Sequence, residues 1–127
     1  MKMLVNFLAV GGAGCLGAMA RYAVALLSAR FFGTGFPIGT FITNISGSFI
    51  LGWFLGMVGG RVQVSDTVRL AVAVGFTGAY TTFSTYVYES NALLGDGSGL
   101  KALFNLLGSV MIGILAVRFG ILAGQRW

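Results

Sequence analysis

Four long apolar stretches constrain the fold of this chain more than any other feature. They run from Leu4 to Leu27, Phe36 to Val58, Val68 to Leu94 and Leu100 to Leu122. A membrane-spanning helix needs about 20 apolar residues to cross a hydrocarbon layer of about 30 Å, so each stretch can span once. With 57% hydrophobic and 9% charged residues, the composition lies outside the range of water-soluble domains. The sequence predicts an all-α membrane protein, with residues 1–127 forming a single four-span transmembrane domain.

Short segments rich in turn-forming residues separate the four stretches. They read SARFFGTG, GGRVQVSD and GDGSG. We expect Pro37 in the first turn of the second helix, where its missing N–H breaks no intrahelical hydrogen bond. An alternative at the N-terminus is a cleavable signal peptide, because Lys2, an apolar run and the A-x-A pattern of Ala18, Met19 and Ala20 have that arrangement. The run is glycine-rich and continues past Arg21, which favours a first span that is retained.

The basic residues bear on how the spans are oriented. Four spans would place Lys2, Arg61, Arg69, Arg118 and Arg126 on one side and Arg21, Arg30 and Lys101 on the other. An excess of lysine and arginine on the cytoplasmic side orients membrane proteins. Five against three is a weak bias, so a single topology with a shallow preference and a dual topology both fit. If both orientations insert, an antiparallel homodimer becomes possible.

Small and polar side chains recur at helical spacing in the second stretch. One face would carry Thr40, Thr43, Asn44, Gly47 and Ser48, followed by Gly52, Gly56 and Gly60. Glycines at this spacing commonly form a packing seam between membrane helices. A buried amide such as that of Asn44 either bonds to another helix or lines a wet path.

The fourth and first stretches carry polar residues in similar patterns. The fourth has one face with Lys101, Asn105, Ser109 and Gly113. We expect Lys101 to extend toward the membrane interface, with Asn105 and Ser109 deeper. Arg21, near the end of the first stretch, would be either an interfacial anchor or an anion-attracting charge in a vestibule.

The segment GFTGAYTTFSTY, Gly75 to Tyr86, lies near the middle of the third stretch. A continuous helix over these 27 residues would be about 40 Å long, more than an untilted crossing requires. Because glycine adopts non-helical geometry easily and threonine is β-branched, we predict an interruption, with a downstream half-helix beginning near Phe83. The alternative is a kinked helix whose hydroxyls bond back to their own backbone.

An interrupted helix in lipid must satisfy the backbone groups that it frees. Each unpaired group costs several kcal/mol, and nearby hydroxyls can satisfy some of them. Carbonyls that converge from two chains around a symmetry axis would suit a hard monovalent cation. The N-terminus of the downstream half-helix would favour an anion.

Chemistry-bearing residues are too few for the common classes of enzyme site. The sequence has no histidine and one cysteine, Cys15, so it lacks the usual imidazole and thiolate ligands. Asp66 and Asp96 fall in predicted loops, and Glu89 is the one acid within a span. The sequence therefore predicts a protein that is not an enzyme. Glu89 leaves open a small proton-coupled multidrug-type transporter, and a non-conducting membrane subunit is another alternative.

Three segments resemble the CrcB/Fluc family of fluoride channels. They are GGAGCLGAMARY (11–22), PIGTFITNISGSFILG (37–52) and GFTGAYTTFSTYVYE (75–89). The resemblance covers essentially the whole chain, and the pattern G-x-x-T-T-F-S-T is its most specific part. It implies a fluoride-selective channel that exports fluoride passively and gives fluoride resistance. It also implies a multi-pass protein of the cell inner membrane, built as an antiparallel, dual-topology homodimer with two pores and a central structural Na+ ion.

The resemblance implies roles for individual residues. The backbone carbonyls of Gly78 and Thr81 from both subunits would hold the sodium ion. Fluoride would pass the amide of Asn44 and the ring edges of Phe83 and Tyr86. Further hydroxyl and amide donors along the path would be Ser84, Thr85, Asn105 and Ser109. Arg21 would lie near a vestibule, and Glu89 would match an acidic residue of the family.

The chain departs from the family at Tyr86, where the family has a second pore phenylalanine. Tyrosine keeps a positive ring edge and adds a hydroxyl, which we expect to bond to Asn44 or to water. Fluoride is small and strongly hydrated, so a pore must replace its water with donors and ring edges. Several weak sites in series let the ion leave, whereas a buried lysine or arginine in the path would trap it.

Overall fold

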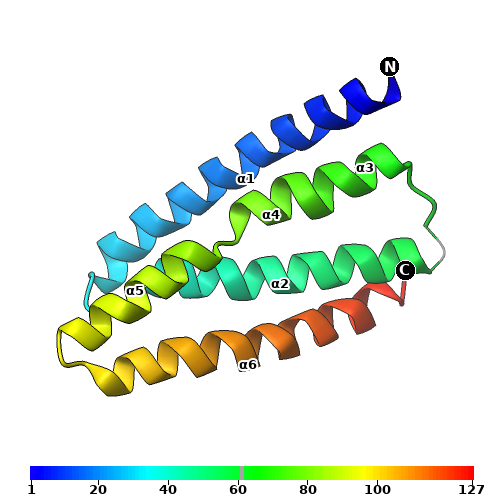
Figure 1. The fold of residues 1–127 in the computed structure, drawn as a ribbon. Helices are drawn as coiled ribbons and strands as arrows, with labels where there is room; N and C mark the ends of the chain where they lie inside the picture. The colour runs from blue at the N-terminus through cyan, green and yellow to red at the C-terminus, as the bar shows by residue number, and fades with distance from the viewer. Residues whose placement is uncertain (61) are drawn as a thin grey trace.

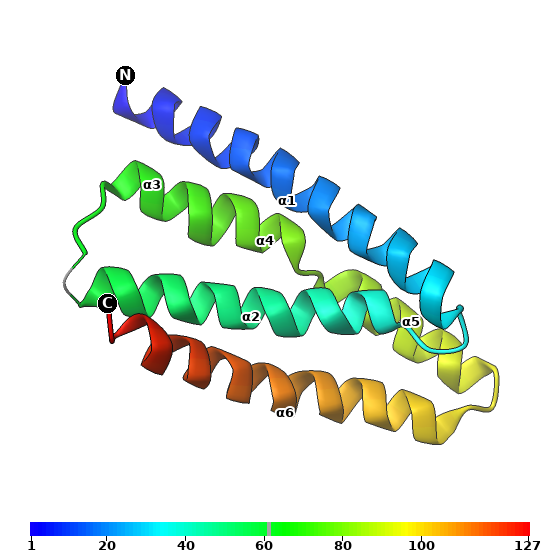
Figure 2. The same ribbon diagram turned by 180° about the vertical axis from the view of Figure 1, so that it is seen from behind.

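The computed structural model describes residues 1–60 and 62–127, and the elements in these ranges are all helical. The elements are α1 (Lys2–Phe32), α2 (Ile38–Gly59), α3 (Asp66–Leu70), η1 (Ala71–Phe76), α4 (Thr77–Tyr80), α5 (Phe83–Gly95) and α6 (Gly99–Gly124). They lie alongside one another as an elongated bundle, with both chain termini at the same end (Figures 1 and 2). The prediction of an all-helical protein is confirmed.

Within the described ranges, three helices are long and apolar enough to cross a membrane, namely α1, α2 and α6. They correspond to the first, second and fourth predicted stretches. The first helix is longer than predicted, because it continues past Leu27 to Phe32. The third predicted stretch, 68–94, is divided among α3, η1, α4 and α5.

Pro37 lies just before α2. Its backbone angles, φ −77° and ψ 61°, are not helical, and α2 begins at Ile38. The Pro37 carbonyl nevertheless accepts a hydrogen bond of 3.0 Å from the N–H of Phe41. The prediction that Pro37 lies inside the first turn was therefore wrong by one position. As a cap residue it contributes its carbonyl, and its missing N–H again costs no helical bond.

Glycines bring the backbones of α2 and α6 into contact. A Cβ atom on Gly56 would lie 2.5 Å from the Ile121 carbonyl oxygen, and one on Gly120 would lie 2.8 Å from the Trp53 nitrogen. Larger residues would push the helices apart, because the neighbouring atoms belong to the backbone and cannot rotate away. The predicted seam is confirmed for Gly52 and Gly56, whereas Gly60 follows the end of α2 and faces that helix's own carbonyls.

The third helical segment changes its packing partner at Thr81 and Thr82. Upstream, η1 and α4 pack against α1, and downstream α5 packs against α6. Both threonines have extended backbones, with φ −84°, ψ 162° at Thr81 and φ −152°, ψ 127° at Thr82. The ribbon shows the resulting step between α4 and α5 (Figures 1 and 2).

The upstream half is tied closely to α1. Element η1 is a wide π-helical turn, which ends with the Thr77 N–H donating to the Val72 carbonyl, five residues back. Gly75 in this turn approaches α1 so closely that a Cβ would lie 2.6 Å from the Val10 carbonyl oxygen. This approach requires glycine.

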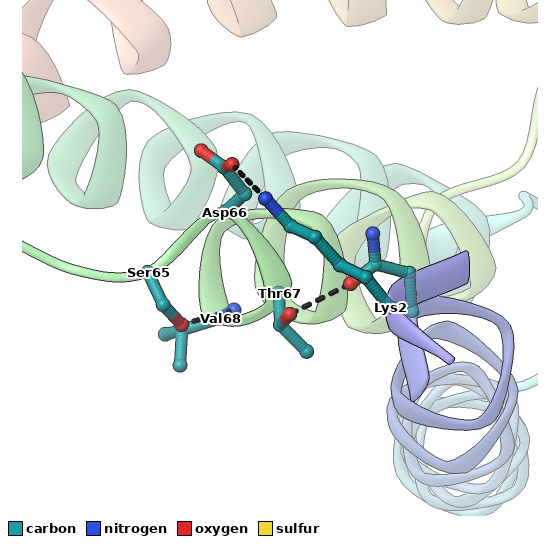
Figure 3. Close-up of polar contacts among 6 residues, drawn as sticks. Lys2, Ser65, Asp66, Thr67 and Val68 are labelled. Atoms are coloured by element: carbon teal, nitrogen blue, oxygen red, sulfur yellow. Dashed lines mark hydrogen bonds and ion pairs between the residues drawn. The ribbon is translucent and has the colours of Figure 1, made fainter. Parts of the chain in front are cut away.

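Polar contacts at the terminal end of the bundle join α1 to the start of α3. The Lys2 ammonium lies 3.1 Å from the Asp66 carboxylate (Figure 3). Beside it, the Thr67 hydroxyl donates to the Asn6 side-chain oxygen over 2.6 Å. Ser65 caps α3 by accepting a bond of 3.3 Å from the Val68 N–H (Figure 3). The exposed ion pair contributes little by itself, but the set fixes where the third segment begins.

Candidate functional site

A cavity of about 350 Å³ lies along the step in the third segment. Side chains and backbone from α2, α4, α5 and α6 line it together with the two extended threonines. Six of the residues predicted from the sequence are among the lining residues: Asn44, Gly78, Thr81, Phe83, Tyr86 and Ser109. The step thus gathers residues that are far apart in the sequence around one space.

The side-chain amide of Asn44 bonds to both backbone groups of Thr82. Its Oδ1 atom accepts from the Thr82 N–H over 2.8 Å, and its Nδ2 donates to the Thr82 carbonyl over 3.0 Å. These backbone groups lie where helical pairing is interrupted, so they need partners from elsewhere. The sequence left two interpretations of Asn44, a bond to another helix or a place beside a wet path. The structure shows its bonds to Thr82 in the third segment, and Asn44 also lines the cavity.

The threonine hydroxyls bond locally around the step. The Thr81 hydroxyl donates to the Thr77 carbonyl over 3.0 Å, as the kinked-helix alternative expected. The Thr82 hydroxyl accepts from the Thr85 N–H over 3.3 Å and donates to the Thr85 hydroxyl over 3.1 Å. Thr82 is therefore the N-cap of α5. Thr81 therefore bonds back to its own helix, and between α4, which ends at Tyr80, and α5, which begins at Phe83, the two threonines are extended.

Phe83 and Tyr86 have different surroundings although their rings are neighbours. Their ring centroids lie 6.0 Å apart with the planes tilted by 44°. Phe83 is 77% exposed at the start of α5, whereas Tyr86 is only 7% exposed. The Tyr86 hydroxyl donates to the Leu106 carbonyl over 2.8 Å. The expected bond to Asn44 is therefore not formed, because this hydroxyl points to α6 and the Asn44 amide bonds to Thr82.

A buried polar chain connects α5 to α6 behind Tyr86. Asn105, which is fully buried, donates from Nδ2 to the Ser90 hydroxyl over 2.9 Å. Ser90 in turn donates to the Tyr86 carbonyl over 2.7 Å, and the Ser109 hydroxyl lies 3.5 Å from Asn105 Oδ1. The sequence interpretation missed Ser90, although it lies four residues after Tyr86 and hence on the same helical face.

The remaining predicted residues do not line the cavity. Ser84 is exposed on α5, Thr85 bonds to Thr82, and Asn105 is linked to the lining residues Ser109 and, through Ser90, Tyr86. Arg21 also lies elsewhere: its Nε donates to the Ala79 carbonyl over 3.0 Å.

Arg21 was placed near a helix end because the first stretch was expected to finish at Leu27. Helix α1 continues to Phe32, so that placement was wrong, and Arg21 is a part-buried group beside α4. The predicted count of five basic residues against three includes Arg21, which lies within α1, and Arg118, which lies within α6. Arg61, which entered the same count, lies outside the described residues.

A second cavity, of about 260 Å³, lies between the end of α1, the start of α2 and the last turns of α5. Glu89 and Thr40 both line it, and the Thr40 hydroxyl donates to Glu89 Oε1 over 2.9 Å. Glu89 Oε2 is buried and has no hydrogen-bond partner among the described residues. Lys101, expected to extend to the interface, donates to the Gly35 carbonyl in the loop before α2 over 3.1 Å.

Comparisons with known proteins agree along nearly the whole chain. A family model described as "CrcB-like protein, Camphor Resistance (CrcB)" matches residues 8–121. A protein of Chloroflexus aurantiacus named "Fluoride-specific ion channel FluC" is 42% identical over 122 residues, which cover 96% of each chain. One of the same name from Chlorobium phaeobacteroides is 43% identical over 120 residues, covering 94% of this chain and 93% of the relative. The "Fluoride-specific ion channel FluC 2" of Moorella thermoacetica is 44% identical over 118 residues, covering 92% and 94%.

Proposed function

The chain belongs to the CrcB-like protein family, and on that premise we propose that it is a fluoride-selective channel through which fluoride leaves the cell passively. The observation that carries the proposal is its identity of 42% to a fluoride-specific ion channel over 96% of the chain. The relatives named above are ion channels, so the activity is transport and not catalysis. We assign it to the cell inner membrane as a multi-pass protein.

Residues 1–127 would act as one transmembrane domain with four crossings. Helices α1, α2 and α6 each provide one crossing, and the interrupted segment from α3 to α5 provides the other. The bond pattern around Thr82 supports this assignment, because its backbone groups are satisfied inside the protein. Irregular backbone at membrane depth is tolerated only where protein or a wet cavity provides partners.

The cavity beside the step would be part of the fluoride path. Phe83 offers an exposed aromatic ring whose positive edge attracts anions, and Tyr86 offers a second ring. Asn44 and Ser109 supply polar atoms to the same space, and Asn105 supports Ser109 from behind. At the start of α5, Ser84 and Thr85 would contribute donors next to free backbone N–H groups, which favour anions. Arg21, beside α4, would add positive charge near this path.

A second copy of the chain would complete the site in an antiparallel, dual-topology homodimer with two pores. Support comes from the open face of the step, since a Cβ on Gly78 would meet no atom of the described residues within 4 Å. Phe83, largely exposed, lies on the same face. The polar side chains of this groove, Asn44 and Ser109, would be unfavourably placed if they faced lipid.

A sodium ion on the dimer axis would be held by the carbonyls of Gly78 and Thr81. These residues fit that role, because in the described ranges neither carbonyl accepts a hydrogen bond from a loop backbone group or from a side chain. Hard cations such as sodium prefer oxygen ligands of this type. The ion would be structural, joining the two chains at their steps.

The proton-coupled transporter remains a second candidate because Glu89 lies in a cavity with one buried, unpartnered oxygen. The two functions differ in what drives flux. For a passive channel, fluoride efflux from liposomes should need only the fluoride gradient and a counter-ion path such as valinomycin with potassium. If a proton gradient drives flux and Glu89→Gln removes this dependence, the transporter is correct and the channel is not.

A further inference from the structure

The carbonyls of Gly78 and Thr81, which we assign to sodium, lack the N–H donors that a continuous helix would give them. Side chains bind those N–H groups instead. In a continuous α-helix, the N–H of residue i+4 donates to the carbonyl of residue i. In a continuous helix, the Thr82 N–H would therefore donate to the Gly78 carbonyl and the Thr85 N–H to the Thr81 carbonyl. Both of these N–H groups are bonded elsewhere, the first to Asn44 Oδ1 at 2.8 Å and the second to the Thr82 hydroxyl at 3.3 Å.

We propose that Asn44 and Thr82 are positioning residues that create the cation site by diverting these two N–H donors. Asn44, on α2, accepts the Thr82 N–H that would otherwise donate to the Gly78 carbonyl. Thr82, the N-cap of α5, accepts with its hydroxyl the Thr85 N–H that would otherwise donate to the Thr81 carbonyl. Neither side chain would touch the cation. This inference rests on the proposed function, because it explains how a site for a monovalent cation arises in that channel.

The geometry around Asn44 supports a role beyond lining the cavity. Its amide uses Nδ2 as well as Oδ1 and so bonds to both the N–H and the carbonyl of Thr82. Two bonds to one extended residue fix the direction of the chain as it leaves α4. Ser48, one turn further along α2 and lining the same cavity, instead bonds to the Asn44 carbonyl over 2.7 Å. It makes no recorded bond to the step and therefore serves as a matched control.

The test measures sodium binding separately from fluoride flux. The purified full-length protein would be heated in sodium chloride or in N-methylglucamine chloride, and its unfolding midpoint followed against sodium concentration. A ligand that binds only the folded state raises the midpoint. For the native chain and for Ser48→Ala, we expect a midpoint that rises with sodium. For Asn44→Ala, the apparent sodium affinity should fall by at least about tenfold, because the variant loses both hydrogen bonds to Thr82.

Conservative variants keep the test decisive if Asn44→Ala does not fold. Asn44→Asp retains an acceptor for the Thr82 N–H and should keep the sodium response. Thr82→Val is nearly isosteric but removes the cap oxygen, so it should lose the response, whereas Thr82→Ser should restore it. Labelling the Gly78 carbonyl with carbon-13 gives a local readout: its chemical shift should respond to sodium in the native protein and not in Asn44→Ala.

The possible results separate this inference from the proposed function. Sodium dependence that is equal in native, Asn44→Ala and Thr82→Val proteins would overturn the inference, even if the protein conducts fluoride. Absence of sodium dependence in a native protein that conducts fluoride would also overturn it and leave the channel in place. Loss of the response in Asn44→Ala and Thr82→Val, with its retention in Ser48→Ala and Thr82→Ser, would support it whatever the flux.

Discussion

The hydroxyl of Tyr86 donates a hydrogen bond of 2.8 Å to the main-chain carbonyl of Leu106 and so ties α5 to α6 beside the cavity. Tyr86→Phe removes this bond and keeps the ring. We expect the variant to conduct fluoride at a rate within about twofold of native, because the ring edge remains. Its free energy of unfolding should fall by about 1 kcal/mol, the typical contribution of one hydrogen bond. Efflux and thermal unfolding would be measured on the same preparation. Loss of efflux in a folded Tyr86→Phe protein would mean that the hydroxyl itself serves the ion.

Phe83 offers a test of the aromatic part of the path. Because its ring is 77% exposed in the protomer, Phe83→Ile should leave the protomer fold intact. Losing the ring edge should reduce fluoride efflux by at least about tenfold. Phe119→Ile is the control, since Phe119 is 64% exposed on α6 and is absent from the cavity lining. Equal efflux in both variants would remove Phe83 from the path.

Two glycines three residues apart should respond differently to an added methyl group. A Cβ on Gly75 would lie 2.6 Å from the Val10 carbonyl oxygen, so Gly75→Ala should destabilise the protomer by about 1–3 kcal/mol. A Cβ on Gly78 meets nothing within 4 Å, so Gly78→Ala should affect only the contact with a second copy. Thermal unfolding and size-exclusion chromatography would separate these effects. A stable dimer of Gly78→Ala would argue against a partner at this face.

The shared position of the two termini allows the topology to be tested at two places. Because both termini lie at the same end (Figure 1), cysteines introduced at position 2 or at position 127, in a Cys15→Ser background, should label alike. Dual topology predicts that membrane-impermeant reagents reach about half of the molecules from each side of the membrane. Labelling from one side alone would contradict the antiparallel dimer.

Much of the fold was predictable because hydrophobic length and helical spacing are local properties of the sequence. The apolar runs located the three long helices, and the spacing of Gly52 and Gly56 predicted a packing seam on α2, although not that α6 is its partner. Helix ends were less accurate: the residues after Leu27 include phenylalanines and an arginine, which a helix accommodates as readily as a loop does. Pro37 was displaced by one position for a similar reason, because proline suits both the cap and the first turn.

The pairing of side chains was not predictable, since it depends on how distant segments meet. Asn44 was recognised as a polar residue in an apolar helix, but its partner Thr82 follows only from the position of the step. Asn44 and water were both expected partners of the Tyr86 hydroxyl, because the sequence does not show that α5 turns this side chain toward Leu106 of α6. Ser90 was missed for another reason: serine bonding back to its own helix is common, so it did not stand out.

Fluoride efflux from liposomes that contain the purified protein tests the central claim most directly. A fluoride electrode would record release down the fluoride gradient after addition of valinomycin in potassium-loaded vesicles, with a chloride electrode for comparison. We expect rapid fluoride release, little chloride release and the same rate with or without a proton gradient. Fluoride release no faster than from protein-free vesicles would contradict it.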